Sequence, residues 1–198
     1  CPFFEHGDVA FFRAVRRGRT IGTIAAIRNG RHNEFHGDRV GFFGLFEVVE
    51  EYPVAEALFD AARDWVKGQG LDTLRGPMNY STNEECGMLI DAFDQPPVVM
   101  MTYNPPYYPA FVQRYGFKKA HDLYAYRLET MTLAPEGKGL PDKVRRVADV
   151  AARRSKVQVR KVDMRRFDQE VELAKAVYND AWSRNWGFVP MTDAEFDH

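Results

Sequence analysis

Six polar or ionisable side chains follow closely on a hydrophobic segment that the sequence predicts to be a strand, Leu71–Leu74. They are Asn79, Ser81, Thr82, Asn83, Glu84 and Cys86. Amide, hydroxyl and carboxylate groups at a strand end can orient a substrate or exchange protons with it. Two interpretations stay open: the cluster lines a ligand cleft, or it is a long loop whose Asn and Ser side chains bond its own backbone. Cys86 is not expected to be a nucleophile, because no neighbour in the sequence lowers its pKa.

A dense aromatic segment, Tyr103–Asn104–Pro105–Pro106–Tyr107–Tyr108, comes next. Each proline fixes its own backbone dihedral, so the tyrosine rings are held in place rather than left mobile. These rings could form the wall of a ligand pocket. They could equally pack in the interior, each with one hydrogen bond from its hydroxyl.

His32 and His36, with Asn33 and Glu34 between them, resemble part of a zinc-protease motif. That motif needs a glutamate directly after the first histidine, on a helix, whereas Glu34 comes one position later. We predict a loop for 29–38, because it is polar and holds two glycines, and we predict no metal site. The histidines then either hold the backbone of the loop or lie at a ligand cleft.

Basic residues are concentrated in the last third of the chain. They are Arg145, Arg146, Arg153, Arg154, Lys156, Arg160, Lys161, Arg165 and Arg166. Acidic residues are interleaved with them, and no aromatic residues alternate with them as a stacking platform for bases requires. We therefore predict a solvated helix face rather than a nucleic-acid site.

The elements that position these residues follow from hydrophobic periodicity. The first half of the chain predicts a hairpin, a central strand, a helix and a short strand: Val9–Val15, Thr20–Arg28, Val40–Val48, Val54–Lys67 and Leu71–Leu74. The second half predicts a short helix near Glu84–Ile90, helix Pro109–Tyr115, strand Leu123–Leu128, linker Thr132–Gly139, helix Pro141–Arg154, strand Val157–Val162 and helix Phe167–Trp182. Thr192 to Glu195 has the pattern of a capping box that begins a last helix.

Composition narrows the class of protein. The chain has 198 residues, of which 45% are apolar, and its formal net charge is −1. A net charge this close to zero does not attract the protein electrostatically to nucleic acid or to anionic lipid. No apolar run reaches the roughly 18–20 residues of a membrane span, so we expect no membrane partner. Two cysteines make no disulfide framework and favour a cytoplasmic location. The chain begins at Cys1 and ends just after a capping box, so we expect it to be part of a longer protein.

The order hairpin, central strand, helix, strand, helix with Tyr115–Gly116–Phe117 resembles the GNAT superfamily of acyl-CoA-dependent N-acyltransferases. Three stretches are also similar to an uncharacterised bacterial family of GNAT-like proteins: 31–36, 102–108 and 185–188. The resemblance implies an α/β (α+β) fold with a mixed, mostly antiparallel central sheet flanked by helices. It further implies a tandem build: residues 1–131 form a GNAT-like unit without its first strand and helices, 132–156 form a linker with a helix, and 157–198 open a second, truncated unit.

The resemblance also implies a ligand and a site. The ligand would be acetyl-CoA or another acyl-CoA, and the reaction transfer of its acyl group to an amine. The implied catalytic residues are Tyr108 and Asn79, the implied cofactor-binding residues are Phe46, Val48, Val49 and Asn104, and no metal is implied.

Two positions depart from the superfamily pattern. The segment 49–54 holds Glu50, Glu51 and Pro53 where the superfamily has a glycine-rich loop for the diphosphate. Val112 stands where many members carry a tyrosine that protonates the thiolate. The alternative functions are therefore a non-catalytic GNAT-like module, or a small-ligand binding domain, that supports an active second half. We also expect the spare strand 157–162 to cover the sheet edge left by the missing first strand, either by folding back within one chain or by exchange between two chains of a homodimer.

Overall fold

The computed structural model describes residues 1–127, 141–155 and 160–197. These form two compact units. The first contains residues 1–121 together with the chain from Ala174 onward, and the second contains 122–173. The division of the chain into a GNAT-like unit, a linker and a second opening remains a prediction.

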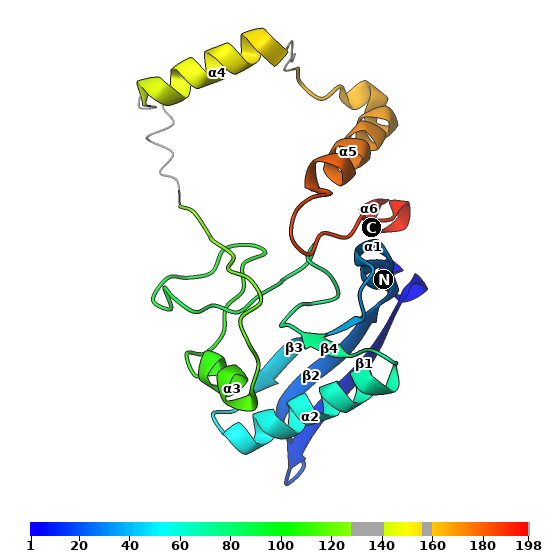
Figure 1. Ribbon diagram of the computed structural model, residues 1–198, viewed down its shortest axis with the longest axis vertical. Helices are drawn as coiled ribbons and strands as arrows, with labels where there is room; N and C mark the ends of the chain where they lie inside the picture. The colour runs from blue at the N-terminus through cyan, green and yellow to red at the C-terminus, as the bar shows by residue number, and fades with distance from the viewer. Residues whose placement is uncertain (128–140, 156–159, 198) are drawn as a thin grey trace. The chain divides into compact units, whose positions relative to one another are not determined.

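A four-stranded sheet forms the centre of the first unit, with the strand order β1-β2-β3-β4. The strands are β1 (Gly7–Arg16), β2 (Arg19–Asn29), β3 (Val40–Val48) and β4 (Thr73–Arg75). The pairs β1–β2 and β2–β3 are antiparallel, whereas β3–β4 is parallel. This confirms the expected hairpin, the central strand and the mixed, mostly antiparallel α+β class (Figure 1).

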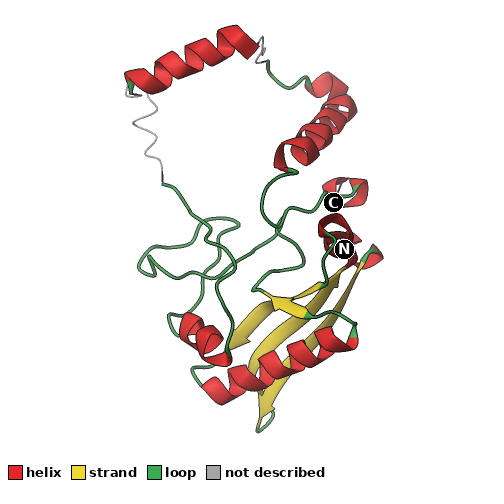
Figure 2. Ribbon diagram, in the orientation of Figure 1, coloured by secondary structure: helices red, strands yellow, loops and turns green. Residues whose placement is uncertain are grey.

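The helix α2 (Tyr52–Gly68) lies along one face of the sheet, as Figure 2 shows. Its apolar stripe buries Ala55, Leu58, Phe59, Ala62 and Val66 against the sheet. Phe46 of β3 stacks on Phe59, with ring centroids 4.7 Å apart. The predicted helix at 54–67 is confirmed, and burial of this stripe is the main contribution to its stability.

The predicted loop at 29–38 is wrong, because a short helix, α1 (Gly30–His36), lies there. Asn29 caps its start by accepting a hydrogen bond from the backbone N–H of His32, and Gly37 ends it in the left-handed conformation. Both signals are present in the sequence, since Asn is a strong N-cap residue and Gly a strong C-cap residue.

Three other predicted elements are wrong in whole or in part. The segment around 84–90 contains no helix, and neither 123–127 nor 160–162 is in a strand. An alternating or β-branched run becomes a strand only where another strand pairs with it, and these runs have no such neighbour among the described residues. Leu128, residues 157–159 and the predicted linker 132–139 lie outside the described residues.

The remaining helices agree with prediction. They are α3 (Tyr108–Tyr115), α4 (Asp142–Ser155), α5 (Phe167–Trp182) and α6 (Asp193–Asp197), with short 3₁₀ turns at Pro2–Glu5 and Met164–Arg166. The capping box of α6 is reciprocal: Thr192 Oγ1 accepts from the N–H of Glu195 at 3.1 Å, and Glu195 Oε2 accepts from the N–H of Thr192 at 2.8 Å. No helix in the described part of the chain is both long and apolar enough to cross a bilayer.

The C-terminal segment packs against the first unit through its backbone. Four consecutive carbonyl groups accept hydrogen bonds from side chains: Gly187 from Thr82, Phe188 from His36, Val189 from Asn83 and Pro190 from Arg31, at 2.8, 2.8, 3.3 and 3.0 Å. Tyr178 of α5 also donates to Asn83 Oδ1 at 2.6 Å. The polar residues of α1 and of the loop after β4 therefore hold this segment.

Candidate active site

The edge of β3 that faces β4 is paired over only three residues. Val40, Gly41 and Phe42 pair with Thr73–Arg75. Two further contacts follow: the N–H of Met78 donates to the carbonyl of Phe43 at 2.8 Å, and the N–H of Leu45 donates to Asn79 Oδ1 at 2.9 Å. Beyond Asn79 the chain leaves β3, so within the described residues no strand pairs with the last residues of β3 on this side.

Gly44 allows the chain after β4 to cross β3 closely. A Cβ atom at this position would lie 2.2 Å from the carbonyl oxygen of Met78 and 2.8 Å from Asn79 Oδ1. Only a residue without a side chain fits such an approach between two backbones. The crossing fixes Asn79, a predicted catalytic residue, beside the strand.

A β-bulge follows directly at Leu45. Its φ is +46°, and the β2–β3 register shifts between Thr23 and Ala25. A bulge inserts one extra residue into a strand and redirects the side chains that come after it. Here it precedes Phe46, which is buried on Phe59, and Glu47, whose side chain is exposed.

Tyr107 and Tyr108 occupy the space beside the end of β3. The hydroxyl of Tyr107 donates to the carbonyl of Val48 at 2.7 Å, and the N–H of Val48 donates to the hydroxyl of Tyr108 at 2.9 Å. The hydroxyl of Tyr108 in turn donates to Glu47 Oε2 at 2.8 Å. The two tyrosines thus bond both backbone groups of Val48, and one of them also holds the carboxylate of Glu47.

Burial raises the pKa of Tyr108 above its ordinary value, and the Glu47 carboxylate raises it further. The hydrogen bond from the Val48 N–H acts in the opposite direction. Because the phenol is 3% exposed and bonded to a carboxylate, it stays protonated at neutral pH and acts as a fixed hydrogen-bond donor.

The structure brings together four of the six predicted site residues: Asn79, Phe46, Val48 and Tyr108 all lie on or beside the end of β3. Asn104 lies elsewhere, because its amide bonds both backbone groups of Leu89 and the carbonyl of Pro105. Val49 faces β2 instead, because its backbone N–H donates to the carbonyl of Ile21. The roles assigned to all six residues stay predictions.

Glu47 is the functional candidate that sequence reasoning missed. It is the only charged residue in the otherwise apolar strand β3. A single carboxylate interrupts the apolar pattern of this strand, so the position can be picked out from the sequence alone.

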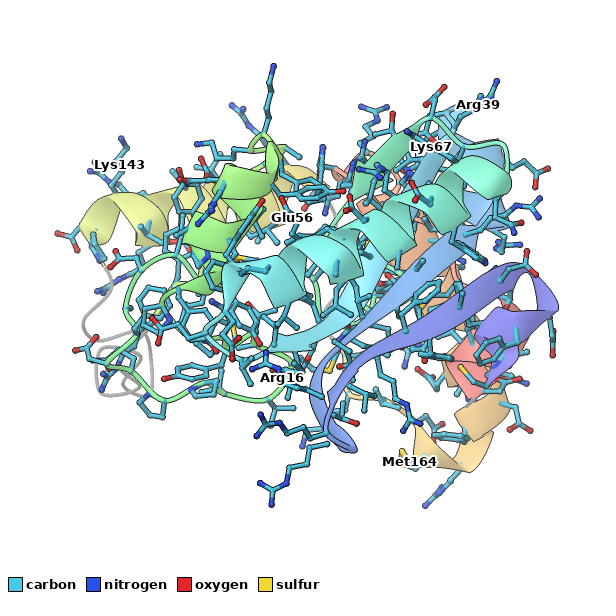
Figure 3. All side chains as sticks on the ribbon, turned by 90° about the horizontal axis from the view of Figure 1, so that it is seen from below. Arg16, Arg39, Glu56, Lys67, Lys143 and Met164 are labelled. Carbon is cyan, nitrogen blue, oxygen red and sulfur yellow. The ribbon has the colours of Figure 1, made fainter. Side chains whose placement is uncertain are left out.

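The start of α2 presents carboxylates where an anion-binding loop would present N–H groups. Glu51, the N-cap residue, accepts two hydrogen bonds from Arg16 at 2.7 and 3.1 Å, and Pro53 has no N–H to offer. The adjacent hairpin turn carries an open hollow lined by Arg16, Arg17, Arg19 and Ile21. Arg16 is labelled in Figure 3, at the end of the hairpin. Positive charge at this end of the sheet therefore comes from arginine side chains.

His32 is the most deeply buried ionisable group of the first unit, at 1% exposed. Its Nε2 lies 3.3 Å from Asp38 Oδ2, and its ring lies 4.3 Å from that of His36. The pKa of His32 is lowered to about 4, mainly by burial and to a smaller extent by His36 and Arg75, although the nearby Asp38 carboxylate acts in the opposite direction. Among the described residues no group of three metal-binding side chains occurs here or elsewhere.

Comparison with known proteins finds two curated relatives. The chain is 39% identical to "Bacterial ceramide synthase" of Caulobacter vibrioides over 98% of its own length and 49% of the relative's. It is 36% identical to "Protein YghO" of Escherichia coli K12 over 92% of its own length and 45% of the relative's. The chain is homologous to both proteins, and it spans about half the length of each. No family model and no solved structure matches it.

Proposed function

We propose that this chain is part of an N-acyltransferase that joins a fatty acyl group to the amine of a long-chain, sphingoid-type lipid. One observation carries the proposal: 39% identity to a bacterial ceramide synthase across 98% of the chain. Ceramides are amides of a fatty acid with such an amine, so the relative's name defines the class of reaction. Relatedness over this length supports a shared class of chemistry.

The donor we propose is an acyl-CoA thioester, bound beside Phe46 at the edge of β3 that faces β4. Backbone groups of alternate residues in a strand point to the same edge. Because Val48 bonds Tyr107 and Tyr108 on this edge, the N–H and C=O of Phe46 point there too. The donor has an extended arm that contains amide groups. These amides would form hydrogen bonds with the backbone N–H and C=O of Phe46, as an added strand does at the edge of a sheet.

Glu47 is the residue we propose as the general base. The amine nitrogen attacks the thioester carbonyl carbon, the C–N bond forms, and the nitrogen's proton passes to the Glu47 carboxylate. The C–S bond then breaks, and the sulfur leaves as a thiolate. Tyr108 acts through Glu47: its hydroxyl, 2.8 Å from the carboxylate, keeps Glu47 in place.

The phosphates of the donor do not fit the start of α2, because Glu51 and Pro53 replace the N–H groups of a glycine-rich loop. The hairpin hollow offers Arg17 and Arg19 instead, next to the Arg16–Glu51 ion pair. Guanidinium groups bind phosphate oxygens through paired hydrogen bonds. We propose that these arginines hold the charged end of the donor.

The test is an acyl-transfer assay on the full-length protein that contains this chain. The protein is incubated with a long-chain acyl-CoA and a sphingoid amine, and amide product is quantified by mass spectrometry. Glu47→Gln is expected to lower kcat by about 10²–10⁴-fold, the usual contribution of a positioned general base. The matched control is Glu50→Gln, an exposed glutamate three residues away, which should leave kcat within about twofold. Full activity of the Glu47→Gln variant would refute the assignment, and no amide from any acyl-CoA and amine pair would refute the function.

A non-catalytic supporting module is the second candidate function. It is favoured by the two tyrosines, because they already bond the backbone groups of Val48 at the end of β3. The same assay separates the candidates. If the full-length protein makes amide and the Glu47→Gln variant makes it equally fast, Glu47 is not the base, and the result favours a catalytic site in the other half that this chain supports.

A further inference from the structure

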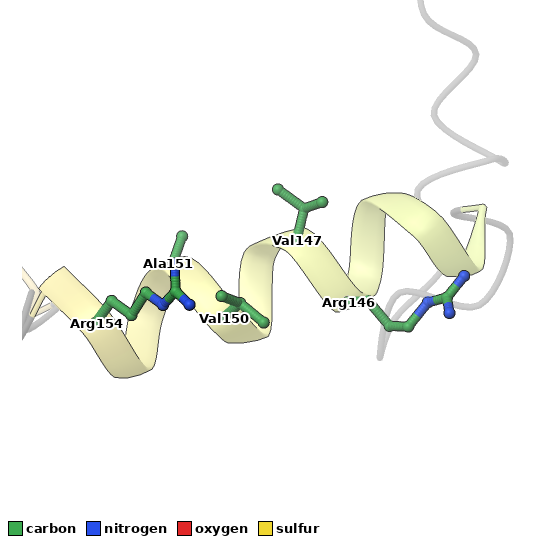
Figure 4. Close-up of a pocket in the computed structure, with 5 residues that line it drawn as sticks. All are labelled: Arg146, Val147, Val150, Ala151 and Arg154. Atoms are coloured by element: carbon green, nitrogen blue, oxygen red, sulfur yellow. The ribbon is translucent and has the colours of Figure 1, made fainter.

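The helix α4 (Asp142–Ser155) of the second unit exposes an apolar stripe. Every residue of α4 is exposed, and Val144 and Val147 of the stripe are 48% and 60% exposed, whereas Val150, at 48%, lies outside the stripe by helical spacing. At about 100° per residue, Val144, Val147, Ala148 and Ala151 fall within about 100° of arc, the width of a buried helix face. Figure 4 shows Val147 and Ala151 on the same side of α4, with Arg146 on another.

The charges of α4 are arranged around this stripe. Lys143 and Arg154 lie at one border of the stripe, by the same helical spacing. Arg146 and Arg153 lie on the opposite face, each four residues after an aspartate, Asp142 and Asp149 respectively. Lys143 and Arg154 therefore place positive charge directly beside the apolar stripe.

The positive charge extends beyond α4. Residues 142–166 contain ten Lys and Arg residues and three Asp residues, a net charge of +7 in a chain whose total is −1. Val162, Met164 and Phe167 of the same unit are 62%, 69% and 54% exposed. Apolar and cationic side chains therefore occur together on this unit.

We propose that α4 binds the surface of an anionic lipid bilayer. A helix lying in the interface buries its apolar stripe at the boundary of the acyl chains, while Lys and Arg at the borders reach the anionic headgroups. Nucleic acid would satisfy the cations but leave the valines exposed. The expectation of no membrane partner rested on overall charge and on the lack of a spanning segment, and a helix on the surface needs neither. Lipid binding is measured without acyl transfer, so this inference stands apart from the proposed function.

The test is cosedimentation of the full-length protein with vesicles. Binding is expected to vesicles of phosphatidylcholine with about 30 mol% phosphatidylglycerol and not to pure phosphatidylcholine, because cations are attracted to anionic headgroups. It should weaken as salt rises from about 0.05 to about 0.5 M, since salt screens these charges. Absence of binding, or equal binding to both vesicle types, would overturn the proposal.

Two adjacent arginines give a matched pair of variants. Arg154→Gln should weaken binding by roughly fivefold, the loss expected for one cation near the surface. Arg153→Gln makes the same change of charge on the far face, about a helix diameter from the headgroups, and should change binding by less than about twofold.

Val147→Gln should weaken binding by about tenfold or more, since a buried valine is replaced by a polar side chain. Gln is a good helix former, and circular dichroism should show unchanged helix content in all three variants. If Val147→Gln binds as tightly as the wild type, or if the two arginine variants are equally impaired, the helix does not insert its stripe. A competition experiment with duplex DNA or RNA tests the alternative ligand. If the nucleic acid displaces the vesicles and binds the Val147→Gln variant as well as it binds the wild type, the proposal is overturned.

Discussion

At the scale of single residues, the ionisable groups Glu47 and His32 differ in their exposure to solvent, and this difference determines what each can do. Glu47 is exposed and held by the buried hydroxyl of Tyr108, so its carboxylate can meet a ligand while its position is fixed. His32 is the opposite case, a histidine so buried that it stays neutral at physiological pH. The first arrangement suits proton exchange with a substrate, and the second makes stability depend on pH.

His32 should make stability depend on pH. Its pKa is about 4 in the folded protein and about 6.5 in an unfolded chain, so between these values the unfolded state binds more protons. The free energy of unfolding should therefore fall as pH drops from about 6.5 to about 4, by on the order of 2–3 kcal/mol. Urea denaturation at several pH values in this window measures the slope.

Two histidine variants isolate this effect. His32→Gln should flatten the slope between pH about 4 and 6.5 whatever its effect on stability at neutral pH. His121→Gln, at an exposed histidine of the same unit, should leave the slope as it is in the wild type. An unchanged slope in His32→Gln would show that other groups cause the pH dependence.

At the scale of elements, the candidate site exists because β4 is short. After three paired residues the chain crosses β3 at Gly44 and leaves it, and the bulge at Leu45 follows at once. The crossing contributes Asn79 to the edge, and the later return of the chain contributes Tyr107 and Tyr108. In the part of the chain that the structure describes, side chains rather than a strand thus border the end of β3.

Gly44→Ala should disrupt this crossing. The added methyl group would meet the backbone oxygen of Met78 at 2.2 Å, so one of the two backbones must move. We expect a loss of about 2–4 kcal/mol of unfolding free energy, at the upper end of the range for core substitutions. The measurement is urea denaturation monitored by fluorescence.

Gly68→Ala is the matched control. Gly68 ends α2, and a Cβ atom there would meet nothing within 4 Å. This substitution should be neutral or stabilise the protein by up to about 1 kcal/mol, because alanine restricts the unfolded chain. Equal effects of the two substitutions would mean that β3 and the chain after β4 do not approach each other as described.

At the scale of the whole molecule, the C-terminal residues of the chain pack with its N-terminal residues in one compact unit. Residues from Ala174 onward belong to the same compact unit as the N-terminal sheet. The polar cluster after β4, which could have lined a ligand cleft, uses Thr82 and Asn83 to bind this segment instead. His36 has a similar role, since it donates to the carbonyl of Phe188.

A double-mutant cycle should detect this packing. Tyr178→Phe and Asn83→Ala each remove one partner of a 2.6 Å hydrogen bond that joins residues 95 positions apart. We expect a coupling free energy of about 1 kcal/mol from urea denaturation of the two single variants and the double variant. A control cycle of Tyr178→Phe with Thr73→Ala, whose hydroxyl bonds Asp72, should give coupling near zero. No coupling between Tyr178 and Asn83 would contradict the packing.

The sequence by itself determined the elements whose signals are local. The hairpin, the central strand, and the helices α2, α3, α4 and α5 follow from periodicity and from capping residues, which act within a few positions of the chain. The mixed, mostly antiparallel sheet follows from their order. The strand predicted at 123–128 failed over its described residues because strand formation depends on a partner that the local pattern does not reveal.

The tertiary structure alone decided which side chains meet. Glu47 and Tyr108 are 61 positions apart, and His36 and Phe188 are 152 positions apart. Nothing in either local pattern specifies these pairs, because each depends on the packing of whole elements against one another. For the same reason the polar residues after β4 could be located from the sequence but not assigned: only folding decided that Asn79 borders β3 while Thr82 and Asn83 bind the C-terminal segment.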